Sequence, residues 1–189
     1  VNSETDFVAK DENFVAFAEA VAALALASGT KDAEALAGEK LDDGRTVEAA
    51  RTELIQKVGE NIGVRRIEAV SADGVLASYA HGARIGVVIA LDGGDEDLAR
   101  DVAMHVAAMN PQYVSEADVP AETLENERRI LTEQAQDSGK PAEIIEKMVT
   151  GRVNKFLKEI TLVGQPFVKD PDVTVGKLLK GASASVVAF

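Results

Sequence analysis

The sequence has 189 residues, and its 20 Lys and Arg against 32 Asp and Glu give a formal net charge of −12. So acidic a surface repels phosphate backbones, which argues against a nucleic-acid-binding protein. Without cysteine the chain can form no disulfide, thiol nucleophile or Cys-ligated metal site, which fits a reducing compartment. The longest strongly apolar stretch, residues 15–27, contains Glu19 and is too short to span a bilayer. We therefore expect a cytoplasmic protein without a membrane segment.

The two ends of the sequence indicate a fragment. It begins Val-Asn-Ser-Glu, with neither an initiator Met nor a basic leader, and it stops inside the apolar run 186–189. We expect a piece of a longer protein, cut at both ends.

Apolar residues at helical spacing predict two helices near the N-terminus. Phe14, Phe17 and Val21 lie on one face of a helix that Asp11 can cap and that Ser-Gly-Thr at 28–30 ends. A second helix is expected from about residue 46 to 58, stopped by a glycine. The charged stretch between the two helices is expected to be a connection without regular structure.

From residue 63 the pattern becomes strand-like. Three short β-branched or apolar runs, 64–70, 75–79 and 85–91, are separated by turn signals and predict an antiparallel three-stranded meander. The third run does not alternate between apolar and polar residues, so we expect it to be the central strand, covered on both faces.

The next helix is expected to begin at a capping Asp95 and to stop before Pro111. His105 falls within its apolar stripe. A histidine there is either a core-edge residue satisfied by a backbone carbonyl or a contact residue for a partner, and the pattern alone favours the first reading.

Two narrow apolar stripes predict an antiparallel helical hairpin. The helices are expected over residues 122–137 and 141–159, joined by Ser-Gly-Lys at 138–140, with Pro141 at the first helical position. A strand is expected at 160–163, followed by a short helix near 175–180 and a final apolar run.

The expected fold class is α+β. We predict two halves, each an antiparallel sheet with helices, and a coiled-coil hairpin between or beside them. The expected domains are an N-terminal α+β half over 1–112, the helical hairpin over 113–160 and a truncated C-terminal α+β half over 161–189.

The sequence offers little support for an enzyme. His81 and His105 are too far apart for a local metal site, and glycine-rich phosphate loops and a nucleophile elbow are absent. We expect no catalytic residue, no metal site and no cofactor. A carboxylate-dependent hydrolase stays open as an unsupported alternative, since most acidic residues lie on a solvated surface.

The segment Thr5, Asp6, Phe7 and Val8 allows two readings. In one, Phe7 and Val8 belong to the core and Asp6 caps a turn, and the pattern alone favours this reading. In the other, Phe7 is an exposed wedge whose burial in a partner's pocket is worth roughly 1.5–3 kcal/mol.

These residues resemble the elongation factor Ts family. The signature Thr-Asp-Phe-Val-Ala-Lys stands at 5–10, and further similar segments follow in the same order over nearly the whole chain. They are Gly-Glu-Asn-Ile at 59–62, Tyr-Ala-His-Gly-Ala-Arg-Ile-Gly at 79–86, Met-His-Val-Ala-Ala at 104–108, Ser-Gly-Lys-Pro at 138–141 and Gly-Gln-Pro-Phe-Val at 164–168.

The resemblance implies a guanine-nucleotide exchange factor of translation elongation that has no active site and acts on the GTPase elongation factor Tu. In the family, the Asp-Phe pair of the Thr-Asp-Phe-Val motif inserts between helices of the GTPase and disturbs the groups that hold magnesium. The implied partner-binding residues are Thr5, Asp6, Phe7, Val8 and His105. The family's N-terminal helical module and the end of its C-terminal part are not represented, and some members form homodimers. A non-catalytic acidic adaptor module is the competing interpretation.

Overall fold

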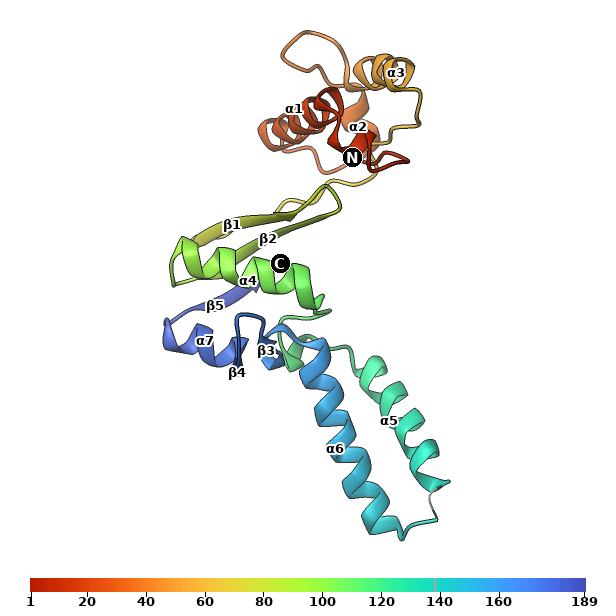
Figure 1. Ribbon diagram of the computed structural model, residues 1–189, viewed down its shortest axis with the longest axis vertical. Coiled ribbons are helices and arrows are strands. Elements are labelled where there is room, and N and C mark those ends of the chain that lie inside the picture. The colour runs from red at the N-terminus through yellow and green to blue at the C-terminus, as the bar shows by residue number, and fades with distance from the viewer. Residues whose placement is uncertain (138) are drawn as a thin grey trace. The chain divides into compact units, whose positions relative to one another are not determined.

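A computed structural model describes residues 1–137 and 139–189 and divides the chain into two compact units. Unit 1 comprises residues 1–70 and 80–86, and unit 2 comprises residues 71–79 and 87–189. Figure 1 shows the elements along the chain, helices combined with small antiparallel sheets. The predicted α+β class is therefore confirmed.

Unit 1 is built on helices α1 (Glu12–Ser28), α2 (Ala33–Ala37) and α3 (Val47–Val58), with the short 3₁₀ turn η1 (Val8–Lys10) before α1. Helix α1 begins where the Asp11 carboxylate accepts the backbone N–H groups of Asn13 and Phe14, and it ends at a left-handed Gly29. Both predicted helices are confirmed. Helix α2 was not predicted, and it lies inside the stretch expected to be irregular.

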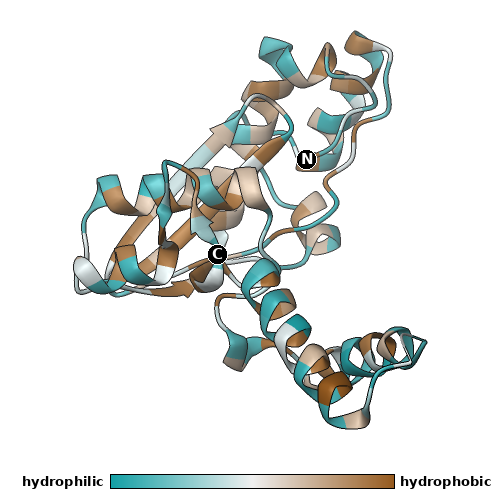
Figure 2. Ribbon diagram, turned by 60° about the horizontal axis from the view of Figure 1, so that its bottom comes forward, coloured by the Kyte–Doolittle hydropathy of each residue, from teal (hydrophilic) through white to brown (hydrophobic). Residues whose placement is uncertain are grey.

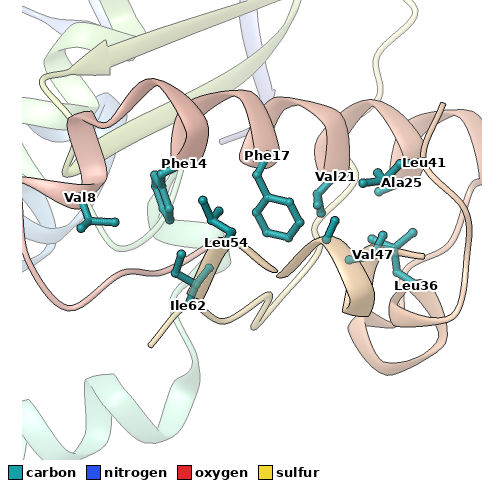
Figure 3. Close-up of a cluster of buried hydrophobic side chains, with 11 residues drawn as sticks. Val8, Phe14, Phe17, Val21, Ala25, Leu36, Leu41, Val47, Leu54 and Ile62 are labelled. Atoms are coloured by element: carbon teal, nitrogen blue, oxygen red, sulfur yellow. The ribbon is translucent and has the colours of Figure 1, made fainter. Parts of the chain in front are cut away.

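The core of unit 1 lies between α1 and α3. Figure 3 shows Phe14, Phe17 and Val21 of α1 directed toward Leu54 and Val47 of α3. The cluster also contains further residues of the three helices and of the segments around them, namely Ala25 of α1, Leu36 of α2, Ala50 of α3, and Val8, Leu41 and Ile62. Burial of these side chains fixes the backbone on either side of α1.

A three-stranded sheet has the order β1-β2-β5, with β1 (Val75–His81), β2 (Ile85–Asp92) and β5 (Ser185–Ala188). It belongs to unit 2 except for residues 80–81 of β1 and 85–86 of β2, which belong to unit 1. Strand β5 pairs antiparallel with β2, and Leu91 lies opposite Val186. Helices α4 (Glu96–Met109) and α7 (Val175–Gly181) share a buried cluster with one face of this sheet. Asp95 caps α4 through the N–H of Leu98, as predicted.

The predicted meander is wrong in its first strand. Residues 64–70 form no strand, and Gly63 makes only an isolated bridge with Asn2. The third strand is β5, so β2 is central, as predicted. Coverage of β2 on both faces holds only over residues 89–91, which are all buried, whereas Ile85 and Val88 are exposed.

The predicted helical hairpin is confirmed as α5 (Ala121–Gln136) and α6 (Ala142–Ile160). Figure 2 shows hydrophobic and hydrophilic bands along both helices. The buried seam consists of Leu131, Ala135, Val149, Val153, Leu157 and Ile160, together with Val119 from the preceding segment. Pro141 is the N-cap residue and not the first helical residue. Of the predicted connection, Ser138 lies outside the described residues.

The strand predicted at 160–163 is wrong. Helix α6 continues through Ile160, and Thr161 follows it with its hydroxyl donating to the Leu157 carbonyl at 2.7 Å. The chain then forms the 3₁₀ turn η3 (Leu162–Gly164), the small hairpin of β3 (Pro166–Phe167) and β4 (Asp170–Thr174), and α7. A further 3₁₀ turn, η2 (Glu116–Asp118), precedes α5. Among residues 1–137 and 139–189, no helix is long and apolar enough to cross a bilayer.

Candidate partner-binding site

Adjacent residues before α1 differ sharply in exposure. Phe7 is 83% exposed, whereas Val8 is 8% exposed and belongs to the core of unit 1. Val8 starts the η1 turn and Phe7 immediately precedes it, so the chain presents one side chain outward while it buries the next. The interpretation that places these residues in the core is thus correct for Val8, and the interpretation that exposes them is correct for Phe7.

The backbone around Phe7 is held by polar contacts to the loop after α3. The Thr5 N–H donates to Glu60 Oε2 at 3.0 Å, and the Thr5 hydroxyl donates to the other oxygen of the same carboxylate. The hydroxyl also accepts the N–H of Val8 at 3.4 Å. Upstream, the N–H of Asn2 donates to the Gly63 carbonyl at 2.8 Å, and the N–H of Gly63 donates back at 3.1 Å. These hydrogen bonds hold the backbone segment that carries Phe7 in place.

Asp6 lies on the surface beside Phe7. Its carboxylate pairs with Lys10 Nζ at 3.6 Å, and the Lys10 side chain is largely exposed while that of Asp6 is partly exposed. An ion pair in water contributes little to stability, because solvent screens it and two flexible side chains must be ordered. The Asp6 carboxylate can therefore exchange Lys10 for a group on a partner at small cost.

His105 is fully buried in α4 within unit 2. Its Nδ1 accepts the N–H of Val168 at 3.1 Å, and its Nε2 lies 2.9 Å from Gln165 Oε1. Because Nδ1 accepts a hydrogen bond, the proton of the neutral ring is on Nε2 and is donated to Gln165. Burial lowers the pKa of His105 below its ordinary value, and the hydrogen bond with Gln165 opposes part of that shift.

The five predicted site residues fall into two groups. Thr5, Asp6, Phe7 and Val8 form one segment of unit 1, and His105 belongs to the core of unit 2. The histidine's place in an apolar stripe is explained by partners far along the chain, Gln165 and the backbone of Val168. Glu60, which holds Thr5, was not singled out, and its only signal was its place in the Gly-Glu-Asn-Ile segment.

The residues at positions 5–8 supply a hydroxyl, a carboxylate and an exposed aromatic ring, a set suited to binding another protein. Among residues 1–137 and 139–189, no group of three or more His, Asp or Glu side chains is placed to hold a metal ion. The sequence profile of the family described as Elongation factor TS matches residues 4–189. The chain belongs to the elongation factor Ts family.

Similar proteins include elongation factor Ts from Hydrogenovibrio crunogenus, 59% identical over all of this chain and 64% of the relative's length. Elongation factor Ts from Legionella pneumophila strain Lens is 58% identical over all of this chain and 65% of its own length. The protein from Alcanivorax borkumensis is 57% identical over all of this chain and 66% of its own length. The chain thus spans slightly less than two thirds of these elongation factor Ts relatives.

Proposed function

We propose that the chain is part of a cytoplasmic guanine-nucleotide exchange factor of translation elongation that binds elongation factor Tu and promotes GDP release. It has no turnover of its own in this proposal. The observation that carries the proposal is Phe7, which is 83% exposed on a segment fastened by Glu60 and by the burial of Val8. Membership of the elongation factor Ts family supports the choice of partner.

A fixed exposed ring is an efficient binding group. Burial of Phe7 in a partner's pocket is worth roughly 1.5–3 kcal/mol. Because Thr5 and Glu60 already order the segment, association gives up less conformational entropy than it would for a mobile loop.

The proposed consequence for the nucleotide is electrostatic. Phe7 enters between helices of the GTPase, and Asp6 is its polar companion near the groups that hold magnesium. Disturbing a dication that neutralises the phosphates weakens GDP binding, because the phosphates then lose their charge compensation. By thermodynamic linkage, a factor that binds the nucleotide-free GTPase more tightly than the GDP-bound GTPase lowers the affinity for GDP by the same ratio.

His105 enters this proposal indirectly, because its buried ring offers no surface to a partner. Its Nδ1 holds the N–H of Val168, whose side chain is 40% exposed. We propose that His105 contributes to partner binding by fixing this exposed apolar side chain.

The test is release of a fluorescent GDP analogue from elongation factor Tu in excess unlabelled GDP. The parent chain is expected to accelerate release, and Phe7→Ala is expected to reduce the effect by about 10–150-fold, the ratio that corresponds to roughly 1.5–3 kcal/mol. Leu26→Ala is the matched control, since Leu26 is 84% exposed in the same unit but outside the segment.

An equal effect of Phe7→Ala and Leu26→Ala would contradict the wedge. Binding that survives Phe7→Ala without any exchange by the parent would favour the adaptor interpretation. Hydrolysis of GTP or GDP by the chain alone would contradict the proposed absence of turnover.

A further inference from the structure

Helix α3 carries an arginine whose guanidinium reaches the loop that follows the helix. Arg51 Nη1 donates to the carbonyl oxygen of Ile62 at 2.7 Å. Its Nε and Nη2 donate to the two carboxylate oxygens of Glu48, one turn earlier on the same helix, at 2.8 and 2.6 Å. The Arg51 side chain is 26% exposed. Glu48 thus orients the guanidinium, and the guanidinium holds the backbone at Ile62.

The loop that Arg51 holds, residues 59–63, also supports the segment before α1. Glu60, in this loop, accepts the N–H and the hydroxyl of Thr5. The end of the loop is joined to the start of the chain by a pair of backbone hydrogen bonds. Phe7 lies only two residues beyond Thr5. A continuous series of hydrogen bonds therefore leads from α3 through the loop to the residues beside Phe7.

We propose that Arg51 is a positioning residue for the exposed ring of Phe7. In this proposal Arg51 acts without touching the partner: it fixes loop 59–63, and the loop fixes Thr5 through Glu60. The proposal rests on the proposed exchange function, in which Phe7 enters the GTPase. Because a ring on a fixed segment gives up less conformational entropy on binding than one on a mobile segment, loss of Arg51 weakens the binding of Phe7.

The geometry of these contacts requires an arginine. A planar guanidinium presents its donors in a fixed fork, so it binds the Glu48 carboxylate along one edge and the Ile62 carbonyl at the remaining nitrogen. A lysine ammonium has a single nitrogen and cannot bind both partners in this way. Arg51→Lys therefore keeps the charge and loses part of the support.

A purely structural role is the alternative, in which the pair of Glu48 and Arg51 stabilises α3 alone. Loss of Arg51 would then loosen unit 1 as a whole and weaken partner binding with or without the ring of Phe7. A positioning role acts only through that ring. The two roles are separated by combining Arg51→Met with Phe7→Ala, because two changes that act through the same contact are not additive.

Release of the fluorescent GDP analogue from elongation factor Tu is measured against the concentration of the chain. Arg51→Met is expected to raise the half-saturating concentration about 3–10-fold, the size of one net hydrogen bond, and to leave the maximal rate unchanged. In the Phe7→Ala background it is expected to have no further effect. Arg45→Met is the matched control, since the Arg45 guanidinium pairs with Asp43 and Glu53, which lie outside the loop.

Amide hydrogen exchange tests the support of the segment without the GTPase. In Arg51→Met, residues 1–10 are expected to take up deuterium faster than in the parent, whereas uptake by residues 20–28 of α1 is expected to stay the same. Arg51→Lys is expected to fall between Arg51→Met and the parent in both assays. Circular dichroism checks that each variant folds, and Arg51→Lys carries the same comparisons if Arg51→Met does not.

Three results would overturn the proposal. They are an equal half-saturating concentration for Arg51→Met and Arg45→Met, an undiminished effect of Arg51→Met in the Phe7→Ala background, and unchanged deuterium uptake by residues 1–10. A parent chain that does not accelerate GDP release would instead refute the proposed exchange function. The deuterium uptake would then still decide whether Arg51 holds the segment that carries Phe7.

Discussion

The hydrogen bonds of His105 allow a graded test of how unit 2 is held together. In His105→Leu, a side chain of similar volume replaces the ring, so packing changes little. The N–H of Val168 then loses its acceptor, and Gln165 Oε1 loses its donor. Each buried polar group left without a partner costs about 1–3 kcal/mol. The expected loss in the free energy of unfolding is therefore about 2–6 kcal/mol for the two groups together.

His105→Asn is the informative companion variant. An Asn Oδ1 can still accept the N–H of Val168, whereas the contact with Gln165 is lost, so about half of the destabilisation is expected. The assay is urea unfolding followed by tyrosine emission. The chain has no Trp, and its two tyrosines, Tyr79 and Tyr113, both belong to unit 2, so the signal reports on the unit that holds His105.

Equal stability of His105→Leu and the parent would refute the reasoning, because two buried polar groups would then have lost their partners at no cost. Equal destabilisation by His105→Leu and His105→Asn would show that the Val168 bond contributes nothing.

The lowered pKa of His105 makes the stability of unit 2 depend on pH. As the pH falls through the ordinary value of 6.5, the unfolded chain binds a proton at His105 before the folded chain does, so unit 2 loses stability on acidification. This change of the urea unfolding midpoint with pH should disappear in His105→Leu. Thr46→Ala removes the hydroxyl that caps α3 and should cost about 0.5–2 kcal/mol in thermal unfolding followed by circular dichroism, whereas Thr46→Ser should not. Gly74→Ala would place a Cβ 2.2 Å from the Leu91 carbonyl oxygen and should cost about 1–3 kcal/mol by tyrosine-monitored unfolding, whereas Gly86→Ala, with open space around it, should be tolerated.

Elements whose ends are set by neighbouring residues were predictable from the sequence. Asp11 and Gly29 bound α1, Thr46 and Gly59 bound α3, and Asp95 starts α4, because capping needs only residues within one turn. Strand pairing depends on distant chain and was predicted less well. Nothing near residues 64–70 shows that they lack a strand partner, and nothing near β2 shows that its second neighbour is β5.

In the candidate site, too, features set by neighbouring residues were predictable, and features that depend on distant residues were not. The pattern at Phe7 and Val8 places two apolar residues side by side but does not decide which one is buried, since that depends on the core formed with Ile62 and Leu54. The family resemblance drew attention to Phe7. For His105, the apolar stripe indicated an interior position, and its actual partners, Gln165 and Val168, come from beyond the helical hairpin.

The order β1-β2-β5 has a consequence for how the chain folds during synthesis. The core of unit 1 uses contacts within its first 62 residues, so this core can close early. In unit 2, strand β2 is made long before β5, and the whole helical hairpin is synthesised between them. One edge of β2 therefore stays unpaired while the hairpin emerges, and closure of the sheet requires a large loop to be ordered first. We expect unit 2 to fold more slowly than unit 1 and to be the part most exposed to aggregation on the ribosome.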